Sequence, residues 1–194
     1  EDEPYHREPI TYEAPYLDNL PTAPREKFAA NIAAIQKLKE IEQRVANGGS
    51  PAFEDEQKIL AQYTGWGGLS DAFDPNKSAW SNEYSQLKAA LSESEYEAAR
   101  SSTLTAFYTP ATVIHPIYRA LERFGVKGGK ILEPSMGTGA FLAHGHFGSS
   151  DAKFYGVELD SITGRISKQL YQKANIQVTG YENALLPDNY FDCV

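Results

Sequence analysis

Cysteine is almost absent from this sequence. Cys193 is the single one, so a disulfide within the chain is excluded, and a reducing cytoplasm is the expected compartment. No apolar run approaches the roughly 20 residues that a membrane span needs, and no charged-then-apolar signal segment opens the chain. We therefore expect a protein without a membrane partner.

Positive charge is also scarce. The chain has 18 Lys and Arg residues against 26 Asp and Glu residues, which gives a net charge of −8. Domains that hold nucleic acid mainly through its phosphates are usually basic, so this chain is not expected to be a self-sufficient DNA clamp. Any basic DNA-binding surface is local or lies elsewhere in a longer protein, and both ends, EDEPYHREP and NYFDCV, are interpreted as cuts through such a chain.

The first half of the chain divides into an arm and a helical region. Residues 1–24 are acidic and rich in proline, with Pro4, Pro9, Pro15 and Pro21 spread along them. This composition predicts an extended arm that Tyr5, Tyr12 and Tyr16 could pin to a surface. Residues 25–103 have the apolar spacing of helices. A long first helix, ended by Asn47-Gly48-Gly49, has an apolar face made of Phe28, Ile32, Ile35, Leu38, Ile41 and Val45.

Three shorter helices are predicted within the rest of that region. The first spans 53–63, with Ile59 and Leu60 turned inward, and the second spans 80–91. Ser92 and Glu95 form a capping-box pattern before the third. Trp66 lies among three glycines in a loop; it is interpreted as a core anchor, with base stacking or a cover over a cofactor as the alternatives.

Beyond residue 104, strand patterns alternate with helix patterns. Thr109 and Pro110 are expected to be the N-cap and the first residue of a helix whose apolar positions continue to Phe124 and which ends at Gly125. Strands are predicted at 130–134, 153–159, 176–180 and from about 190, and helices at 139–146 and 162–171. The predicted fold class is α/β, with a partial parallel sheet that binds ligands at the carboxyl ends of its strands.

The stretch KILEPSMGTGAF has the glycines of a nucleotide-binding turn. No lysine follows Gly137 and Gly139, which excludes a Walker A loop, and Leu142 stands where a dinucleotide loop has its third glycine. Glu133, at the end of the strand, suits an ammonium group. S-adenosylmethionine carries such a group, and Glu158 (or Asp160 beside it) is placed to accept hydrogen bonds from ribose hydroxyls. An incidental structural turn is the alternative.

The motifs FYTP, LEPSMGTGAF, GVELD and GYENALLPDNYFD occur in the order typical of DNA adenine-N6 methyltransferases, and residues 104–194 resemble that family. The segments NIAAIQKLKEIE and LAQYTGWGGLSDAF resemble the region ahead of the methylase domain in large methylase–helicase proteins of phages and conjugative elements. The resemblance implies a Rossmann-like class I methyltransferase core, truncated in this chain. It also implies S-adenosylmethionine as cofactor, and DNA and a helicase region as partners through the full-length protein.

The resemblance also implies the roles of individual residues. Thr109 and Pro110 match a motif that touches the methionine carboxylate, although Thr109 could be a helix cap only. Glu158 matches the ribose acid, while Glu182 or Asn183 would contact the adenine. The full set of cofactor-binding residues is Thr109, Pro110, Glu133, Pro134, Gly137, Gly139, Phe141, Glu158, Leu159 and Glu182.

No catalytic residue is assigned within the chain. The family's catalytic tetrapeptide, a polar residue, two prolines or similar residues and an aromatic residue, is expected just after Val194, so the fragment alone is expected to be inactive. His144 and His146 lack a third ligand, and no metal site is predicted. Arg119, Arg123, Lys127 and Lys130 are interpreted as a solvated surface rather than a phosphate track.

Two kinds of rival function stay open. The first is a methyltransferase for RNA, protein or a small molecule, and the second is a non-catalytic methylase-fold module that docks DNA or protein beside a helicase. For a DNA methyltransferase, protection against restriction and maintenance of a mobile element are both compatible biological roles. The segment after Val194 would separate these functions.

Overall fold

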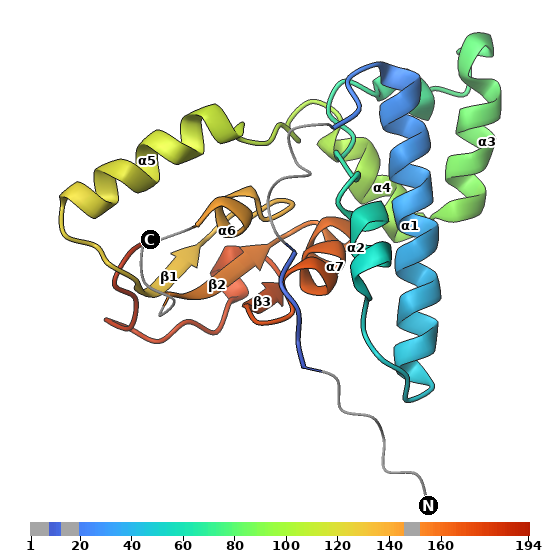
Figure 1. Cartoon of the computed structure of the whole chain (residues 1–194). Helices are drawn as coiled ribbons and strands as arrows, with labels where there is room; N and C mark the ends of the chain where they lie inside the picture. The colour runs from blue at the N-terminus through green and yellow to red at the C-terminus, as the bar shows by residue number, and fades with distance from the viewer. Residues whose placement is uncertain (1–7, 13–19, 146–151) are drawn as a thin grey trace, which may run out of the picture.

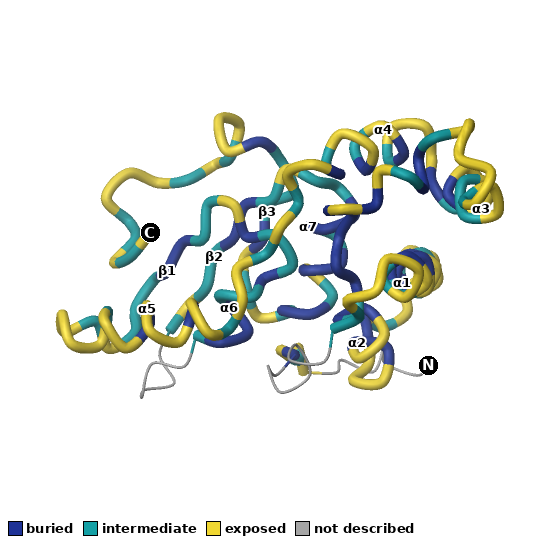
Figure 2. The backbone as a smooth tube through the Cα atoms, turned by 90° about the horizontal axis from the view of Figure 1, so that it is seen from above, coloured by how far each residue is buried: buried dark blue, intermediate teal, exposed yellow. Residues whose placement is uncertain are grey.

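The computed structural model describes residues 8–12, 20–145 and 152–194. A group of helices from the first half of the chain lies beside a three-stranded sheet with its own helices (Figure 1). The predicted mixed α/β architecture with a parallel sheet is confirmed. The main hydrophobic core joins the two parts and runs from α1 through α7 to Ile176 of β3, along buried chain that Figure 2 shows in dark blue. A smaller cluster of Ile114, Tyr118 and Ile131 lies between α5 and β1.

Helix α1, Pro24–Ala46, is the longest element and begins on a proline at its first turn. Its apolar face is predicted correctly apart from Val45, which is 42% exposed at the last turn. Asn31, on the same face, is fully buried and holds the backbone of the loop at 63–65. The fully buried side chains Ala34, Ile35, Leu38 and Ile41 form the centre of this face.

Helix α2, Glu54–Leu60, is shorter than the predicted helix at 53–63. Leu60 is buried as expected, but Ile59 is 40% exposed, which corrects the prediction that both turn inward. The helix ends early because Thr64 N–H is bound by the Asn31 side chain, which draws the following segment into the core. Gln57 donates to the last carbonyls of α7, at 2.8 Å to Gln169 O, and so joins the two helices.

Helices α3, Ser81–Ala90, and α4, Glu93–Ser102, complete the helical region. The capping box before α4 is confirmed: Glu95 N–H donates to Ser92 Oγ at 3.3 Å, and Ser92 N–H donates to Glu95 Oε2 at 2.9 Å. Short 3₁₀ turns at Ser70–Phe73 and Ser78–Trp80 connect these helices to the loop around Trp66.

The sheet consists of β1, Gly129–Glu133, β2, Ala152–Glu158, and β3, Asn175–Val178, in that order and all parallel. A fourth segment returns to the free side of β1. Cys193 forms a parallel bridge with Ile131, and Leu132 N–H donates to Cys193 O at 2.9 Å. Strands β2 and β3 lie on one side of β1, and residue 193 lies on the other. The order in which segments are added across the sheet therefore reverses at β1, although all pairings are parallel.

Helices α5, Ala111–Arg123, α6, Ala140–His144, and α7, Ser161–Leu170, accompany the strands. The prediction for the start of α5 was wrong by one residue: Pro110 is extended, with ψ 153°, and is itself the N-cap, while Thr109 makes no capping bond. The apolar face of α5 is also only partly buried. Ile114 and Tyr118 contact the core, whereas Val113, Ile117 and Phe124 are exposed, the last by 84%.

The predicted acidic arm is described only at residues 8–12 before residue 20. Thr11 forms an antiparallel bridge with Tyr171, and Tyr12 N–H donates to Leu170 O at 2.7 Å. Tyr12 is 5% exposed, which fits the expectation that this tyrosine attaches the arm to the surface. Tyr5 and Tyr16, named in the same expectation, lie outside the described residues, and so does His146.

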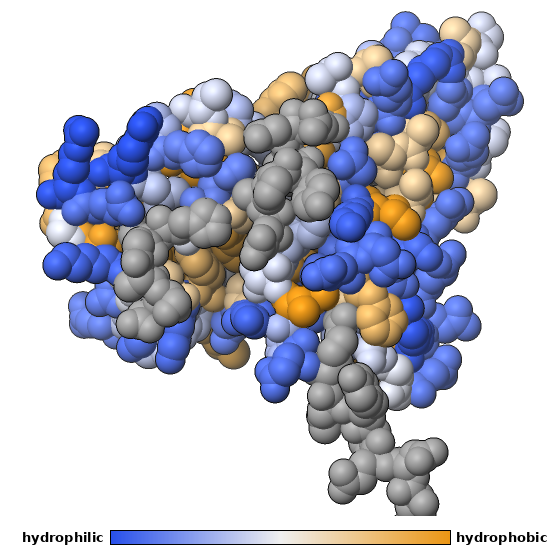
Figure 3. Space-filling model, in the orientation of Figure 1, coloured by the Kyte–Doolittle hydropathy of each residue, from blue (hydrophilic) through white to orange (hydrophobic). Residues whose placement is uncertain are grey.

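Hydrophilic residues cover much of the surface that Figure 3 shows, and hydrophobic residues form separate patches on it. Within the described ranges, no helix combines the length and the apolar character that crossing a bilayer requires.

Arg165 of α7 connects the sheet region to the helical region by ion pairs. Its guanidinium donates to both carboxylate oxygens of Glu42 in α1, at 2.6 and 2.7 Å, and to Glu95 Oε1 in α4 at 2.7 Å. Lys39 also contacts Glu95, at 3.0 Å. Burial alone would raise the pKa of Glu95, but the hydrogen bonds from Arg165, the Ser92 backbone and Lys39 outweigh it and lower the pKa to about 2.

We expect this network to make unfolding depend on pH. Because the folded-state pKa of Glu95 lies below its ordinary value of 4.5, its contribution is complete above pH 4.5 and is lost as the pH falls toward about 2. Glu95→Gln should lower the free energy of unfolding at pH 6 by about 2 kcal/mol and flatten its slope across that window, since the carboxylate keeps some solvent contact. Urea unfolding at several pH values measures this, with Glu97→Gln on the exposed side of α4 as control. Equal slopes in wild type and Glu95→Gln would contradict it.

Candidate functional site

A cavity of about 680 Å³ lies at the carboxyl ends of β1 and β2. Such ends, at the point where a parallel sheet reverses its strand order, are the usual ligand position in open α/β sheets. The volume is within the range of small-molecule sites. The lining residues come from the sheet loops and from the helical region: Tyr63, Gly65, Ala98, Ser101, Ser102, Thr105, Ala106, Phe107, Tyr108, Ser135, Gly137, Glu158, Leu159, Asp160 and Thr163.

Glu158 fastens the two sheet loops to each other. Its Oε2 accepts a hydrogen bond from Gly137 N–H at 2.8 Å, and its Oε1 accepts one from Asp160 N–H at 2.8 Å. Burial raises the pKa of Glu158, and the backbone N–H groups of Asp160 and Gly137 oppose that rise. Each carboxylate oxygen keeps a second lone pair, so Glu158 can still accept hydrogen bonds from a ligand.

Asp160, the alternative to Glu158 in the sequence analysis, has a different role in the fold. It is the N-cap of α7, and its Oδ1 accepts hydrogen bonds from Thr163 N–H at 2.7 Å and from the Thr163 hydroxyl at 2.6 Å. It nevertheless lines the cavity beside Glu158.

The two glycines of the β1 loop have positive φ angles, 55° at Gly137 and 80° at Gly139. A Cβ at Gly137 would lie 2.8 Å from the Tyr108 ring, and one at Gly139 would overlap the ring of Tyr171. Aromatic rings therefore occupy the space that both glycines leave free. Gly137 lines the cavity, whereas Gly139 is buried and is not among the described lining residues.

The charge of the cavity is acidic. Glu158 and Asp160 are its charged lining residues, and none of the described residues that line it is basic. The N–H of Gly137, which a phosphate-binding loop would offer to its ligand, is bound by the Glu158 carboxylate. A phosphate placed there would face like charge without a compensating cation, whereas a cationic or neutral ligand would not.

The helical region contributes the opposite part of the lining. Tyr63 and Gly65, from the loop after α2, and Ala98, from α4, reach the cavity together with the linker at 105–108. Tyr108 connects the two halves, since its ring lies against Gly137 and its hydroxyl lies against Gly65. Burial raises the pKa of Tyr108 and of Tyr63, so both are neutral phenols at pH 7.

Three predicted site residues line this cavity, namely Gly137, Glu158 and Leu159. Glu133 is half-buried, and burial raises its pKa while a hydrogen bond from Ser135 N–H opposes that rise. Phe141 packs on Tyr118, with ring centroids 6.2 Å apart. Glu182 is exposed in the 3₁₀ turn Tyr181–Asn183. The other predicted site residues are not among the described residues that line the cavity, namely Thr109, Pro110, Glu133, Pro134, Gly139, Phe141 and Glu182.

Sequence reasoning missed the lining residues of the helical region. Tyr63, Gly65 and Ser101 lie far from the strand motifs in the chain and reach the site only through tertiary packing. The one available signal is the glycine-rich loop around Trp66. Trp66 itself is 1% exposed and packs edge-on against Phe73, with ring centroids 5.3 Å apart, so the interpretation as a core anchor is correct.

Histidine does not form a metal centre in the described part of the chain. His144 Nδ1 lies 3.1 Å from His115 Nε2, so the two rings bond to each other. No group of three or more His, Cys, Asp and Glu residues that could hold a metal ion occurs within residues 8–12, 20–145 and 152–194.

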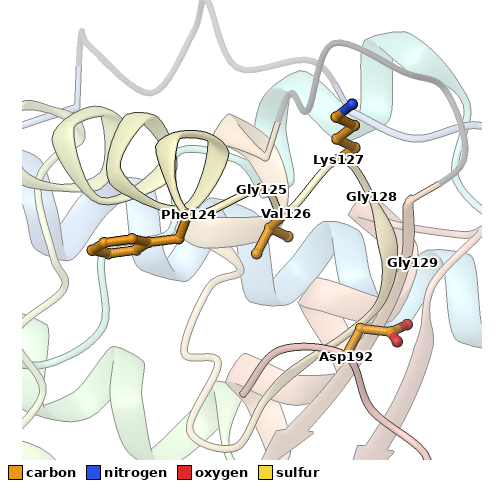
Figure 4. Close-up of a pocket in the computed structure, with 7 residues that line it drawn as sticks. All are labelled: Phe124, Gly125, Val126, Lys127, Gly128, Gly129 and Asp192. Carbon is orange, nitrogen blue, oxygen red and sulfur yellow. The ribbon is translucent and has the colours of Figure 1, made fainter.

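A second hollow, of about 560 Å³, lies at the amino end of β1 (Figure 4). It is lined by residues 124–129 and Asp192, and the Phe124 ring points away from Asp192. The Asp192 carboxylate accepts a hydrogen bond from Lys130 N–H at 2.8 Å. Because this edge is opposite to the one where parallel sheets bind ligands, the hollow is not a candidate site.

Comparison with known proteins finds one relative for nearly the whole chain. No family model and no solved structure matches. The chain is 26% identical over 191 residues, 97% of its length, to the Defense against restriction protein B of Escherichia phage P1. It spans only 7% of the length of that protein. The chain is thus similar to a small part of a phage protein that is named for defence against restriction.

Proposed function

We propose that this chain is the S-adenosylmethionine-binding part of a DNA methyltransferase that transfers a methyl group to adenine N6. The observation that supports it most is the acidic cavity at the switch point of the sheet, in which Glu158 occupies the N–H group that a phosphate would need. S-adenosylmethionine has no phosphate, and its sulfonium and ammonium groups suit this charge. The order of the four methyltransferase motifs and the partly Rossmann-like sheet agree with this proposal.

The residues present fit the cofactor. The spare lone pairs of Glu158 would accept hydrogen bonds from the two ribose hydroxyls, and Leu159, which is 77% exposed at the rim, would cover an apolar part of the adenosyl group. When bound, the cofactor supplies an activated methyl group on sulfur. The contribution of the protein is to hold that methyl in line with the attacking amine, which requires alignment more than proton transfer.

DNA as the substrate is supported by the resemblance and by the name of the relative. A phage protein named for defence against restriction fits a role in modifying DNA, and the chain matches a part of it. The methyl-accepting site and the DNA-binding surface would belong to the full-length protein, because the described residues contain no group assigned to catalysis.

Calorimetric titration tests cofactor binding. We expect the chain to bind S-adenosylmethionine and its demethylated product, and to bind ATP and NAD at least about 100-fold more weakly, because each phosphate would approach Glu158 and Asp160 without a basic partner. The proposal would be contradicted if ATP bound as tightly as S-adenosylmethionine, or if neither S-adenosylmethionine nor its demethylated product bound.

The methyl acceptor is tested with the full-length protein. Radiolabelled cofactor and unmodified DNA should give N6-methyladenine, identified after digestion by mass spectrometry. Label in RNA, in protein or in cytosine would contradict the adenine assignment, and so would binding of the cofactor without any transfer.

A further inference from the structure

The loop at residues 63–67, which we call the roof loop, belongs to the helical region but forms part of the cavity wall. Tyr63 and Gly65 line the cavity directly, and a Cβ at Gly67 would overlap the backbone of Ala106. The loop therefore packs against the linker that carries Tyr108. Two phenol rings, Tyr63 and Tyr108, share this cavity with the two carboxylates of the sheet loops.

The roof loop is held rigidly from α1. Asn31, fully buried, donates from Nδ2 to Gly65 O at 2.6 Å and accepts from Thr64 N–H at 2.8 Å. Lys27 Nζ donates to Gly67 O at 2.9 Å. Trp66 anchors the loop in the core, where its ring packs edge-on against Tyr63 with centroids 6.4 Å apart. Because the Nδ2 and Oδ1 atoms of one buried amide both bond to the roof loop, Asn31 fixes the position of the loop as well as its shape.

The position of the roof loop determines the position of Tyr108. Gly65 has φ 68°, and a Cβ there would lie 2.6 Å from the Tyr108 hydroxyl and 3.2 Å from its ring. On its other side the ring lies against Gly137, where a Cβ would be 2.8 Å away. Tyr108 is thus clamped between a glycine of the helical region and a glycine of the β1 loop.

We propose that the roof loop is the second half of the ligand site, and that it positions Tyr108 as a ligand-contacting ring between the roof loop and the β1 loop. This inference rests on the proposed adenosyl ligand. Aromatic faces attract both a sulfonium cation and a stacked purine, and that ligand contains both groups. In this proposal the helical region is part of the binding site.

The chain offers a matched pair of glycines to test the clamp. Gly65 in the roof loop and Gly68 just after it have similar positive φ angles, 68° and 77°, but Gly68 does not line the cavity and a Cβ there would meet nothing within 4 Å. Gly65→Ala and Gly68→Ala therefore carry similar backbone strain, and only the first displaces Tyr108. By titration with the demethylated cofactor we expect Gly65→Ala to bind about tenfold more weakly and Gly68→Ala to bind within about twofold of wild type. Thermal unfolding shows whether both variants are folded.

A second variant covers the case in which Gly65→Ala does not fold. Tyr108→Leu removes the ring without straining the loop, and it should also weaken binding about tenfold. Wild-type affinity in Tyr108→Leu, or equal affinities in the two glycine variants, would overturn the inference while the proposed function stands. Absence of binding by the wild-type chain would contradict both.

Discussion

Replacing Glu158 by Gln should lower the affinity for the demethylated cofactor on the order of 100-fold. The carboxylate accepts from Gly137 N–H and Asp160 N–H, each at 2.8 Å, and has two lone pairs left for the ribose. A Gln side chain of the same shape must turn its NH₂ group toward one of these N–H donors. It therefore loses a loop contact and a ligand contact together, and calorimetry measures the combined effect.

Two comparisons separate this effect from general loss of charge. Glu122→Gln, on the exposed side of α5, removes one acid without touching the cavity and should bind like wild type. In the wild-type chain the affinity should fall as the pH drops through the pKa of Glu158, which burial places above 4.5, because the protonated group accepts fewer hydrogen bonds. If the Glu158→Gln variant bound the demethylated cofactor as tightly as wild type, Glu158 would not be a ligand-binding residue.

Gly139→Ala should destabilise the fold by on the order of 3 kcal/mol, the largest stability effect that we expect from a single methyl group. Gly139 has φ 80°, and a Cβ would overlap the ring of Tyr171. That ring cannot move easily, because Tyr171 is 1% exposed and its backbone is paired with Thr11. Urea unfolding measures the loss.

Gly125→Ala is the matched control for strain. Its φ is 91°, but nothing lies within 4 Å of the added Cβ, so only the backbone cost of about 1–2 kcal/mol remains. If the two variants were equally stable, the contact with Tyr171 would not be the reason for glycine at position 139.

Glu158 and the glycines of the β1 loop illustrate what could be predicted from sequence. The place of Glu158 at the end of β2 follows from local strand and turn patterns, and so does the need for glycine at 137 and 139. The partners of the glycines do not follow, because Tyr108 and Tyr171 reach them through tertiary packing. The sequence analysis assigned both glycines to cofactor binding, whereas in the fold aromatic side chains fill the space beside them.

The same limit explains the incomplete prediction of the site. Strand and turn patterns led to Gly137, Glu158 and Leu159, which line the cavity at the carboxyl ends of β1 and β2. The other wall depends on how the helical region packs on α7, through contacts such as Gln57 with Gln169 and Arg165 with Glu42. Such contacts have no periodic signal, and Tyr63 and Gly65 were therefore not predicted as site residues.

The pairing of β1 with residue 193 has a consequence for the order in which the protein folds during synthesis. β1 can pair with β2 soon after both leave the ribosome, but its other edge stays open until residues 192 and 193, about 60 positions later, are made. An open edge of a central strand is a template for pairing with the wrong chain. Slow synthesis of that stretch would therefore be expected to raise aggregation of the nascent protein, even though no contact in the finished fold is altered.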